Sequence, residues 1–391
     1  MQCLTERTDM NITKFVTPEI IFGCGSLSQI GESALRLGAS KVFIVSDEGV
    51  IDSGWVEIAC SYLKQAGLEM EIFSALTTNP KDHEIEVGLA QYLQSGCDAL
   101  IAVGGGSPTD VAKSIAMLAT NGGELRQFEG VNNINRPLPP MIMVPSTAGA
   151  GSEVSQFAII VDTERQLKMS IISKSLVPDI AIVDPELLRT KDSWLAAATG
   201  VDALTHGIEA YVSLAATPLT DIHALNAIRL ISANLRHAVL HRDDIESNTN
   251  MAMASLSAGI AFSNAILGAT HAMTHQVDGL LDHHHGETNA AILPHVMEFN
   301  LPANPAKFST IAETMGKNIR GLSSMNAAQL AITAVNEIIY DIGLAKGLAQ
   351  FGIEKEMINA LSINALNDAC LITNPRETSL QDIEDIFHKA L

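Results

Sequence analysis

The sequence predicts an α/β N-terminal domain with a mostly parallel sheet, followed by an all-α C-terminal domain. Two observations indicate this fold class. Up to about Leu188, short apolar runs alternate with segments of helical periodicity, the pattern of βαβ units. Beyond Trp194 the strand signal disappears. A chain of 391 residues suits two to three domains, and we expect two, covering residues 1–190 and 191–391.

Four apolar runs, each ending in glycine, proline or small polar residues, are predicted to be buried strands. They lie at residues 41–47, 69–76, 97–106 and 140–149. Residues 85–96, between the second and third runs, have helical periodicity. In residues 155–173 two apolar runs flank a polar turn, which predicts an antiparallel hairpin beside the parallel sheet.

The second half is predicted to be helical throughout. Thr217 followed by Pro218 is typical of a helix start, because a hydroxyl can cap the helix and proline suits its first position. Apolar side chains then recur every three or four residues over residues 222–235. Residues 251–270 are rich in Ala, Ser and Gly, which lets helices approach closely.

The composition favours a well-buried globular enzyme, with 47% apolar and 17% charged residues, and the cysteine pattern indicates the cytoplasm. No apolar run is long enough to span a membrane, and residues 1–11 lack the features of a secretory signal. The five cysteines, Cys3 among them, are scattered and include no CxxC pair, so we expect no disulfide framework. A net charge of −20 argues against nucleic acid as a partner.

The segment GGGSPTD at residues 104–110 is predicted to bind phosphate. It follows a strand and opens a helix, whose N-terminal N–H groups favour an anion. Its glycines, which allow a tight turn and close backbone approach, are Gly104, Gly105 and Gly106. We expect Ser107 at the N-cap, Pro108 at the first helical position and Asp110 as the capping-box partner. The segment is not GxGxxG, so a plain tight turn is the alternative.

Two further polar positions follow predicted strands. The loop STAGAGSE at residues 146–153 offers the hydroxyls of Ser146, Thr147 and Ser152 to a phosphate or ribose, although a plain turn explains it equally well. Asp47 ends the strand at residues 41–47 and could accept the ribose hydroxyls of a nucleotide. Such a carboxylate favours NAD over NADP; a helix N-cap is the alternative role.

Histidines gather in the second half, where six of the twelve lie within residues 271–295. Two pairs have i,i+4 spacing and therefore share a helix face: Asp202 with His206, and His271 with His275. A run of three histidines follows at residues 283–285. Two helices and a loop can together bind a divalent metal in this way. Ala272 breaks the HExxH pattern of metalloproteases.

The order and spacing of seven motifs over nearly the whole chain resemble the iron-containing alcohol dehydrogenase family. They are FGCGSL (22–27), GGGSPTD (104–110), PSTAGAGSEVS (145–155), TGVDALTHGIEAYVS (199–213), GATHAMTH (268–275), HGETNAAILPHVMEFN (285–300) and TNPRE (373–377). The resemblance implies a Rossmann-like nucleotide-binding domain and a helical metal-binding domain with the metal in the cleft between them. It also implies hydride transfer between a small primary alcohol or aldehyde and NAD, with Fe²⁺ or alternatively Zn²⁺.

The resemblance also implies a role for each matching residue. The metal ligands are Asp202, His206, His271 and His285. His275 is placed beside the nicotinamide, where it can relay the alcohol proton. The cofactor-side positions are Asp47, Gly104, Gly105, Gly106, Ser107, Asp110, Thr147, Ser152 and Lys168. The apolar wall around the substrate is Phe157, Phe262 and Cys370.

Two departures from the family pattern affect these assignments. His284 stands where the family usually has proline, so it could compete with His285 for the metal. Ser146 and Ala150 replace common threonines in the second loop, which affects the detail of the cofactor contacts.

Two other functions are weighed against the dehydrogenase. A dehydroquinate-synthase-like, NAD- and metal-dependent lyase needs a cluster of Lys and Arg around an anionic substrate, and residues 259–289 contain neither. A non-catalytic metal-binding protein would be indicated by loss of a ligand, and all four candidates are present. We expect a homo-oligomer that acts on a small alcohol or aldehyde.

Overall fold

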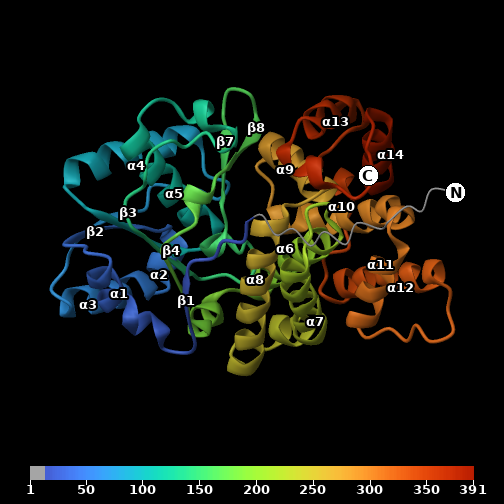
Figure 1. The fold of residues 1–391 in the computed structure, drawn as a ribbon, viewed down its shortest axis with the longest axis horizontal. Helices are drawn as coiled ribbons and strands as arrows, with labels where there is room; N and C mark the ends of the chain where they lie inside the picture. Colours follow the sequence, from blue (N-terminus) through green and yellow to red (C-terminus); the bar gives the residue numbers. More distant parts are fainter. Residues whose placement is uncertain (1–13) are drawn as a thin grey trace, which may run out of the picture.

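The computed structural model describes residues 14–391, and both residues 1–11 and Cys3, named in the sequence analysis, lie outside this range. Figure 1 shows a blue-to-green half built around a sheet and a yellow-to-red half built of helices. The predicted fold class is confirmed: a parallel α/β half precedes a helical half.

A six-stranded, fully parallel sheet forms the centre of the first half, in the order β1-β9-β6-β4-β2-β3. Its strands are β1 (Glu19–Phe22), β2 (Lys41–Val45), β3 (Glu69–Phe73), β4 (Ala99–Gly104), β6 (Met141–Pro145) and β9 (Ile180–Val183). The four predicted strands all form. Sequence reasoning missed β1 and β9, which have only four residues each.

Helices cover both faces of this sheet. On one face lie α1 (Ile30–Arg36), α2 (Glu48–Asp52) and α3 (Trp55–Gln65), and on the other lie α4 (Asp82–Ser95) and α5 (Gly106–Asn121). Burial on both faces explains why the strands read as continuous apolar runs rather than alternating ones. On β2, for example, Phe43 packs with the α4–α5 side and Ile44 with the other.

The predicted hairpin forms part of a second, three-stranded sheet. The strands β7 (Phe157–Asp162) and β8 (Leu167–Ile172) pair antiparallel, and β5 (Gly130–Val131) joins β8. Gly279 on α9 (Ala269–Leu281) faces the start of β8 so closely that a Cβ there would lie 2.7 Å from the Cα of Leu167. The hairpin therefore lies directly against the helical half, as Figure 1 also shows.

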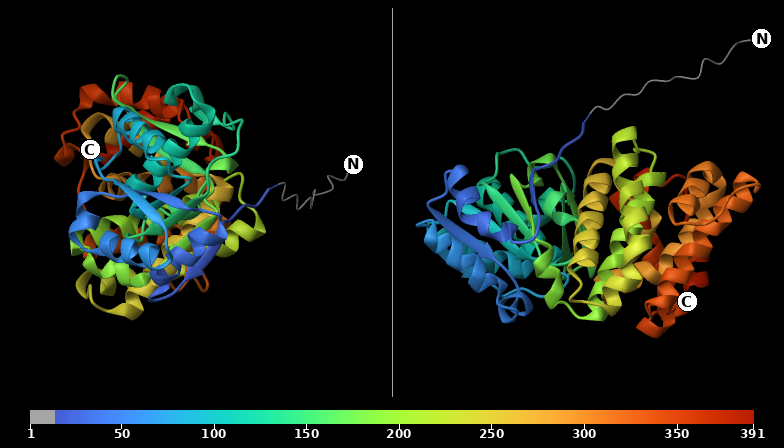
Figure 2. Two further views of the ribbon diagram at one scale, coloured as in Figure 1. Left: turned by 90° about the vertical axis from the view of Figure 1, so that its left-hand side faces the viewer. Right: turned by 90° about the horizontal axis from the view of Figure 1, so that it is seen from below.

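The second half consists of nine α-helices among the described residues. They are α6 (Ser193–Val212), α7 (Pro218–Leu240), α8 (Ile245–Ala265), α9 (Ala269–Leu281), α10 (His285–Asn300), α11 (Pro305–Thr314), α12 (Ser324–Asp341), α13 (Ile358–Leu366) and α14 (Leu380–Ala390). Figure 2 shows the long helices α6 to α8 standing side by side next to the α/β half. The predicted helix start is confirmed, since the Thr217 hydroxyl accepts from the N–H of Thr220 and Pro218 begins α7.

The small-residue segment at 251–270 spans two helices, because the chain breaks at Ile266, which has a φ of +61°. In the described part of the chain no single helix has the length and apolarity to cross a membrane. The helices α8 and α9 are together long and apolar enough by length and composition alone, but they are bent by 102° where they meet.

The hairpin turn is held by the buried carboxylate of Asp162, which accepts from the guanidinium groups of Arg126 and Arg165 at 2.6–2.8 Å. Burial opposes ionisation, but the two arginines outweigh it and lower the pKa of Asp162 to about 2. The folded pKa therefore lies below the ordinary value of 3.8. The ion pairs stabilise the protein at neutral pH and lose this effect as the pH falls towards 2.

We expect Asp162→Asn to lower the free energy of unfolding by about 2 kcal/mol at neutral pH, since hydrogen bonds between charged groups are worth about 1.5–3 kcal/mol. Urea unfolding of both proteins over a pH series measures this difference. It should be constant above about pH 5 and shrink in more acidic solution. A difference that does not change with pH would contradict the assigned ion pairs.

Candidate active site

A cavity of about 360 Å³ lies between the two halves and is lined by residues of both. Most of the predicted site residues line it. From the α/β half these are Asp47, Gly105, Gly106, Ser107, Asp110, Thr147, Ser152, Phe157 and Lys168, and from the helical half Asp202, His206, Phe262, His271, His275 and His285. Gly104 and Cys370 are not among the lining residues.

The sheet order brings the predicted nucleotide loops together. β6, β4 and β2 are neighbours, so the loop after Pro145, the loop after Gly104 and the carboxylate of Asp47 all lie at their carboxyl ends. The N–H of Ser146 donates to the carbonyl of Gly104, which ties the two loops together. Ligands of open α/β sheets bind at this edge.

The predicted capping of α5 is wrong. The helix begins at Gly106, its N-cap is Gly105, and no side chain caps it. Ser107 lies one residue inside the helix, so its hydroxyl is not the cap. Without a side-chain cap, the first N–H groups of α5 remain available to an anion.

Asp110 is the half-buried fifth residue of α5, and it accepts from the backbone N–H of Ile159 at 3.2 Å instead of capping the helix. Burial raises the pKa of this carboxyl to about 6. One turn later, the fully buried ammonium of Lys113 donates to the carbonyls of Ser152, Ser155 and Phe157. The start of α5 therefore fixes the segment that carries Ser152 and Phe157 to the cavity.

Asp47 is both a helix cap and a cavity residue. Its carboxylate accepts from the N–H of Val50 at 3.0 Å as the N-cap of α2. The same side chain lines the cavity, and its Oδ2 would lie 3.3 Å from a Cβ built on Gly104. Asp47 can therefore cap α2 and still face a nucleotide ribose in the cavity.

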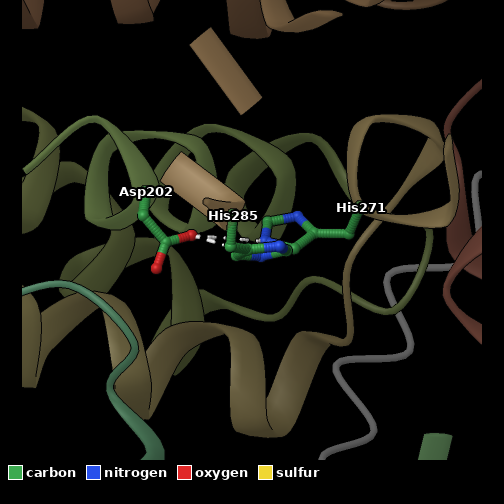
Figure 3. A group of neighbouring side chains, drawn as sticks. All are labelled: Asp202, His271 and His285. Atoms are coloured by element: carbon green, nitrogen blue, oxygen red, sulfur yellow. Dashed lines mark ion pairs between the residues drawn. The ribbon is translucent and has the colours of Figure 1, made fainter. Parts of the chain in front are cut away.

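The predicted metal ligands come together around one oxygen atom. The Nε2 atoms of His206, His271 and His285 lie 3.7, 3.7 and 3.6 Å from Oδ1 of Asp202. Helix α6 supplies Asp202 and His206, one turn apart, while α9 supplies His271 and α10 supplies His285. Figure 3 shows the imidazoles of His271 and His285 directed at the Asp202 carboxylate.

Each of these imidazoles has a separate acceptor near its other nitrogen. His271 Nδ1 lies 2.6 Å from Glu209, whose carboxylate also accepts from the N–H groups of Gly268 and Thr270 at the start of α9. His285 Nδ1 lies 2.7 Å from Asp278, and His206 Nδ1 lies 3.3 Å from the carbonyl of Gly149. With a proton on Nδ1, each Nε2 has a free lone pair directed at the same point.

The charges of the cluster depend strongly on one another. Burial opposes the charge of Asp202, but the neighbouring imidazoles outweigh it and hold its pKa well below the ordinary range. Burial lowers the pKa of His206 to about 3 and that of His285 to about 4. Burial also acts against protonated His271, yet the carboxylates of Asp202 and Glu209 raise its pKa to about 9.

This donor set fits a divalent metal ion. His271 Nε2 is buried and has no hydrogen-bond partner among the described residues, although the Asp202 oxygen lies 3.7 Å away. That separation is too long for a hydrogen bond. It is close to the distance of about 3.4 Å between two ligands that each lie ~2.1 Å from a tetrahedral ion. One carboxylate with three neutral imidazoles suits Fe²⁺ or Zn²⁺.

His284 and His275 lie beside this cluster without joining it. His284 stacks edge-on against Trp194, with ring centroids 4.7 Å apart, and lines the cavity outside the group of atoms that meet around Asp202. His275 instead directs Nδ1 at Asp368, 2.9 Å away. Cys370 is fully buried near His275 and Asp368 rather than in the cavity wall.

Two phenylalanines form the apolar part of the wall. The ring of Phe262 stacks on His206 at 4.3 Å between centroids, and Phe157 contacts Phe262 edge-on at 5.6 Å. Close backbone packing positions this wall, since a Cβ on Gly259 would lie 2.7 Å from the carbonyl oxygen of Gly151.

Lys168, on β8, reaches the cluster from the α/β half. Its ammonium lies 2.9 Å from the carboxylate of Asp278, which is also the partner of His285. The hydroxyl of Thr288 donates to the other oxygen of Asp278. Sequence reasoning assigned no role to Asp278 or Glu209. Their spacing gave a signal, because Asp278 follows His271 by seven residues and Glu209 follows His206 by three on the same helix faces.

Comparison with known proteins identifies the family of the chain. The family model described as iron-containing alcohol dehydrogenase matches residues 17–185, and the model of the C-terminal part of the Fe-containing alcohol dehydrogenase family matches residues 196–391. The chain is 44% identical over 379 residues to 1,3-propanediol dehydrogenase of Klebsiella pneumoniae, which covers 96% of this chain and 98% of that protein.

A second relative, the NAD-dependent methanol dehydrogenase of Bacillus methanolicus, is 40% identical over 377 residues, covering 96% of this chain and 99% of that protein. A crystal structure of 1,3-propanediol oxidoreductase superposes with a TM-score of 0.95 at 43% identity, covering 97% of this chain and all of the other. The chain therefore belongs to the iron-containing alcohol dehydrogenase family, as its motifs predict.

Proposed function

We propose that this alcohol dehydrogenase transfers a hydride between a small primary alcohol or aldehyde and NAD. One observation carries the proposal. Three imidazole nitrogens and one carboxylate oxygen converge in the same cavity that contains the uncapped start of α5. A metal-type donor set and a phosphate-type loop in one cavity suit a metal-dependent, nucleotide-linked reaction.

The α/β side of the cavity is proposed to bind NAD. The N–H groups at the start of α5 would hold the pyrophosphate, with Gly105 and Gly106 allowing the backbone to approach it. Thr147, Ser152 and Lys168 supply further polar groups along the cavity. Asp47 at its end would accept ribose hydroxyls and repel the 2′-phosphate of NADP.

The helical side is proposed to hold the metal, with Fe²⁺ favoured and Zn²⁺ as the alternative. Its ligands would be Asp202, His206, His271 and His285. When bound, the ion polarises the substrate oxygen as a Lewis acid, and NAD accepts or returns the hydride. Glu209 and Asp278 orient two of the ligand histidines from behind.

The remaining cavity residues act on the substrate itself. His275 lines the cavity beside the cluster, its ring centroid 5.7 Å from that of His285, and would take up or return the alcohol proton. Phe157 and Phe262 exclude water and leave room for a small substrate. Cys370 would contribute from behind His275, since its buried thiol lies near that side chain and does not line the cavity.

The lyase alternative receives less support. Lys168 and Lys191 are the cations among the cavity-lining residues, apart from the histidines, and Lys168 is already paired with Asp278. An anionic substrate would therefore find little free positive charge. A purely metal-storing role does not explain the nucleotide-type loops beside the cluster.

The setting of the enzyme is also part of the proposal. Four described cysteines are free, which suits the cytoplasm, and the charge of −20 suits neither nucleic acid nor an anionic membrane surface as a partner. The chain is also proposed to form a homo-oligomer, for which several strongly exposed apolar side chains are available. Examples are Leu214, Leu240 and Ile372, whose exposed fractions are 69–75%.

A cofactor experiment tests the role of Asp47. We expect the protein to prefer NAD over NADP, and Asp47→Gly to reduce that preference by at least about 10-fold in kcat/KM, because a repelling carboxylate is removed. Steady-state rates with both cofactors measure it. Equal kcat/KM for the two cofactors in the unmodified protein would refute this role.

A metal experiment tests the division of labour between His271 and His275. Oxidation of short primary alcohols, followed by NADH absorbance, should be lost in His271→Ala together with bound metal, because a ligand is missing. His275→Ala should keep its metal and be slower by about 10²-fold or more, with an altered pH profile. Metal analysis of both purified variants decides the matter. If His275→Ala loses its metal as readily as His271→Ala, the assignment is wrong.

A further inference from the structure

A buried carboxylate lies behind His275, on the side away from the cavity. Oδ2 of Asp368 is 2.9 Å from Nδ1 of His275, and the two side chains are only 3% and 4% exposed. They come from separate parts of the chain, since His275 is on α9 and Asp368 is the residue before the 3₁₀ helix η9 (Ala369–Thr373). This contact exists only in the folded protein.

Asp368 is itself held in place. Its Oδ1 accepts from the backbone N–H of Cys370 at 2.8 Å, as the cap of η9. The side-chain amide of Gln276 lies 3.4 Å from Oδ2, the oxygen that also faces His275. The carboxylate therefore has one fixed orientation, with one oxygen for the backbone and the other for the imidazole.

This arrangement decides which nitrogen of His275 carries the proton. A neutral imidazole has one N–H and one lone pair, and a carboxylate at hydrogen-bond distance favours the N–H on Nδ1. The lone pair is then on Nε2, at the opposite edge of the ring. Because Nδ1 faces Asp368 and His275 lines the cavity, Nε2 is the nitrogen that can reach a substrate.

We propose that Asp368 is a positioning residue that makes His275 a proton acceptor in alcohol oxidation. The inference rests on the proposed relay role of His275. In alcohol oxidation the hydroxyl proton moves to Nε2 as the hydride moves to NAD, and the carboxylate of Asp368 balances the charge of the imidazolium. The imidazolium then releases that proton to water. In aldehyde reduction the same proton returns to the substrate oxygen.

The competing explanation is that Asp368 only caps η9 and stabilises the fold. The two explanations differ in what Asp368→Asn should change. An asparagine keeps the size and an acceptor oxygen for the cap, but its amide can donate to Nδ1 and so favour the other tautomer. A structural role would change stability, whereas a positioning role changes turnover and its pH dependence through His275.

The experiment compares four variants: Asp368→Asn, His275→Ala, the double variant and Asp244→Asn. Asp244 is a matched control outside the cavity, because it also caps a helix, α8, and lies 3.3 Å from a histidine, His237. We expect Asp368→Asn to lower kcat by about 10²-fold, and by no more than His275→Ala does, because Asp368 acts through His275. Its metal content and its KM for alcohol and NAD should stay close to those of the unmodified protein. The control should keep full activity.

Two readouts separate positioning from stability. If Asp368 acts through His275, the double variant is no slower than His275→Ala, because the effects of two residues that act as a unit do not add. Nitrogen NMR of the metal-free protein should show the proton on Nδ1 of His275, and a shift towards Nε2 in Asp368→Asn. The proposal would be overturned if the loss of kcat in the double variant were the product of the two single losses. It would also be overturned if the proton stayed on Nδ1 of His275 in Asp368→Asn.

The failure of each proposal has its own signature. If His275→Ala keeps full turnover, the relay role of His275 is wrong and the role of Asp368 falls with it. If His275→Ala is slow while Asp368→Asn is as active as Asp244→Asn, His275 is still the relay and only the proposal for Asp368 is wrong.

Discussion

The rest of the site depends on the contacts that surround the buried carboxylate of Asp202. The residue is only 5% exposed, and an isolated charge in such a place would be very costly. Three imidazoles and the amide of Asn289 surround it, and they come from three helices. The packing of α6, α9 and α10 is therefore fixed by the need to bring these groups to one carboxylate. A Cβ on Gly286, next to His285, would collide with the carbonyl of Ala198 on α6, so the helices meet backbone to backbone.

Carboxylates behind the histidines extend this cluster into the protein. Glu209 both orients His271 and caps α9, so the position of the ligand and the start of its helix are set by one side chain. Asp278 is shared between His285 and Lys168, which comes from β8 in the α/β half. The nucleotide side and the metal side are thus joined by a buried ion pair as well as by the shape of the cavity. Asp368 likewise orients His275, by facing its Nδ1.

The sequence predicted the fold class, the four longer strands and the grouping of the histidines, because these depend on local pattern and on i,i+4 spacing. Spacing alone could not separate His271 from His275, because both lie on one face of α9, and only the family resemblance distinguished them. In the structure, His271 directs Nε2 at Asp202, whereas His275 directs Nδ1 at Asp368, 93 residues away in the chain. The predicted capping of α5 was wrong because Gly105, which has no side chain, is the N-cap, and the carboxylate of Asp110 instead accepts from the backbone N–H of Ile159 on β7. Glu209 and Asp278 were missed because a single acidic residue on a helix usually faces solvent. Their spacing to His206 and His271 was the available signal, and the tertiary packing shows that both side chains are buried.

The central claim is that one carboxylate and three imidazoles of this chain hold the metal. X-ray absorption at the metal edge of protein loaded with Fe²⁺, and separately with Zn²⁺, measures the donor atoms directly. The account predicts scattering from three imidazoles, assigned to His206, His271 and His285, together with oxygen donors and no sulfur. Sulfur at about 2.3 Å, or fewer than three imidazoles in protein that retains its metal, would contradict it.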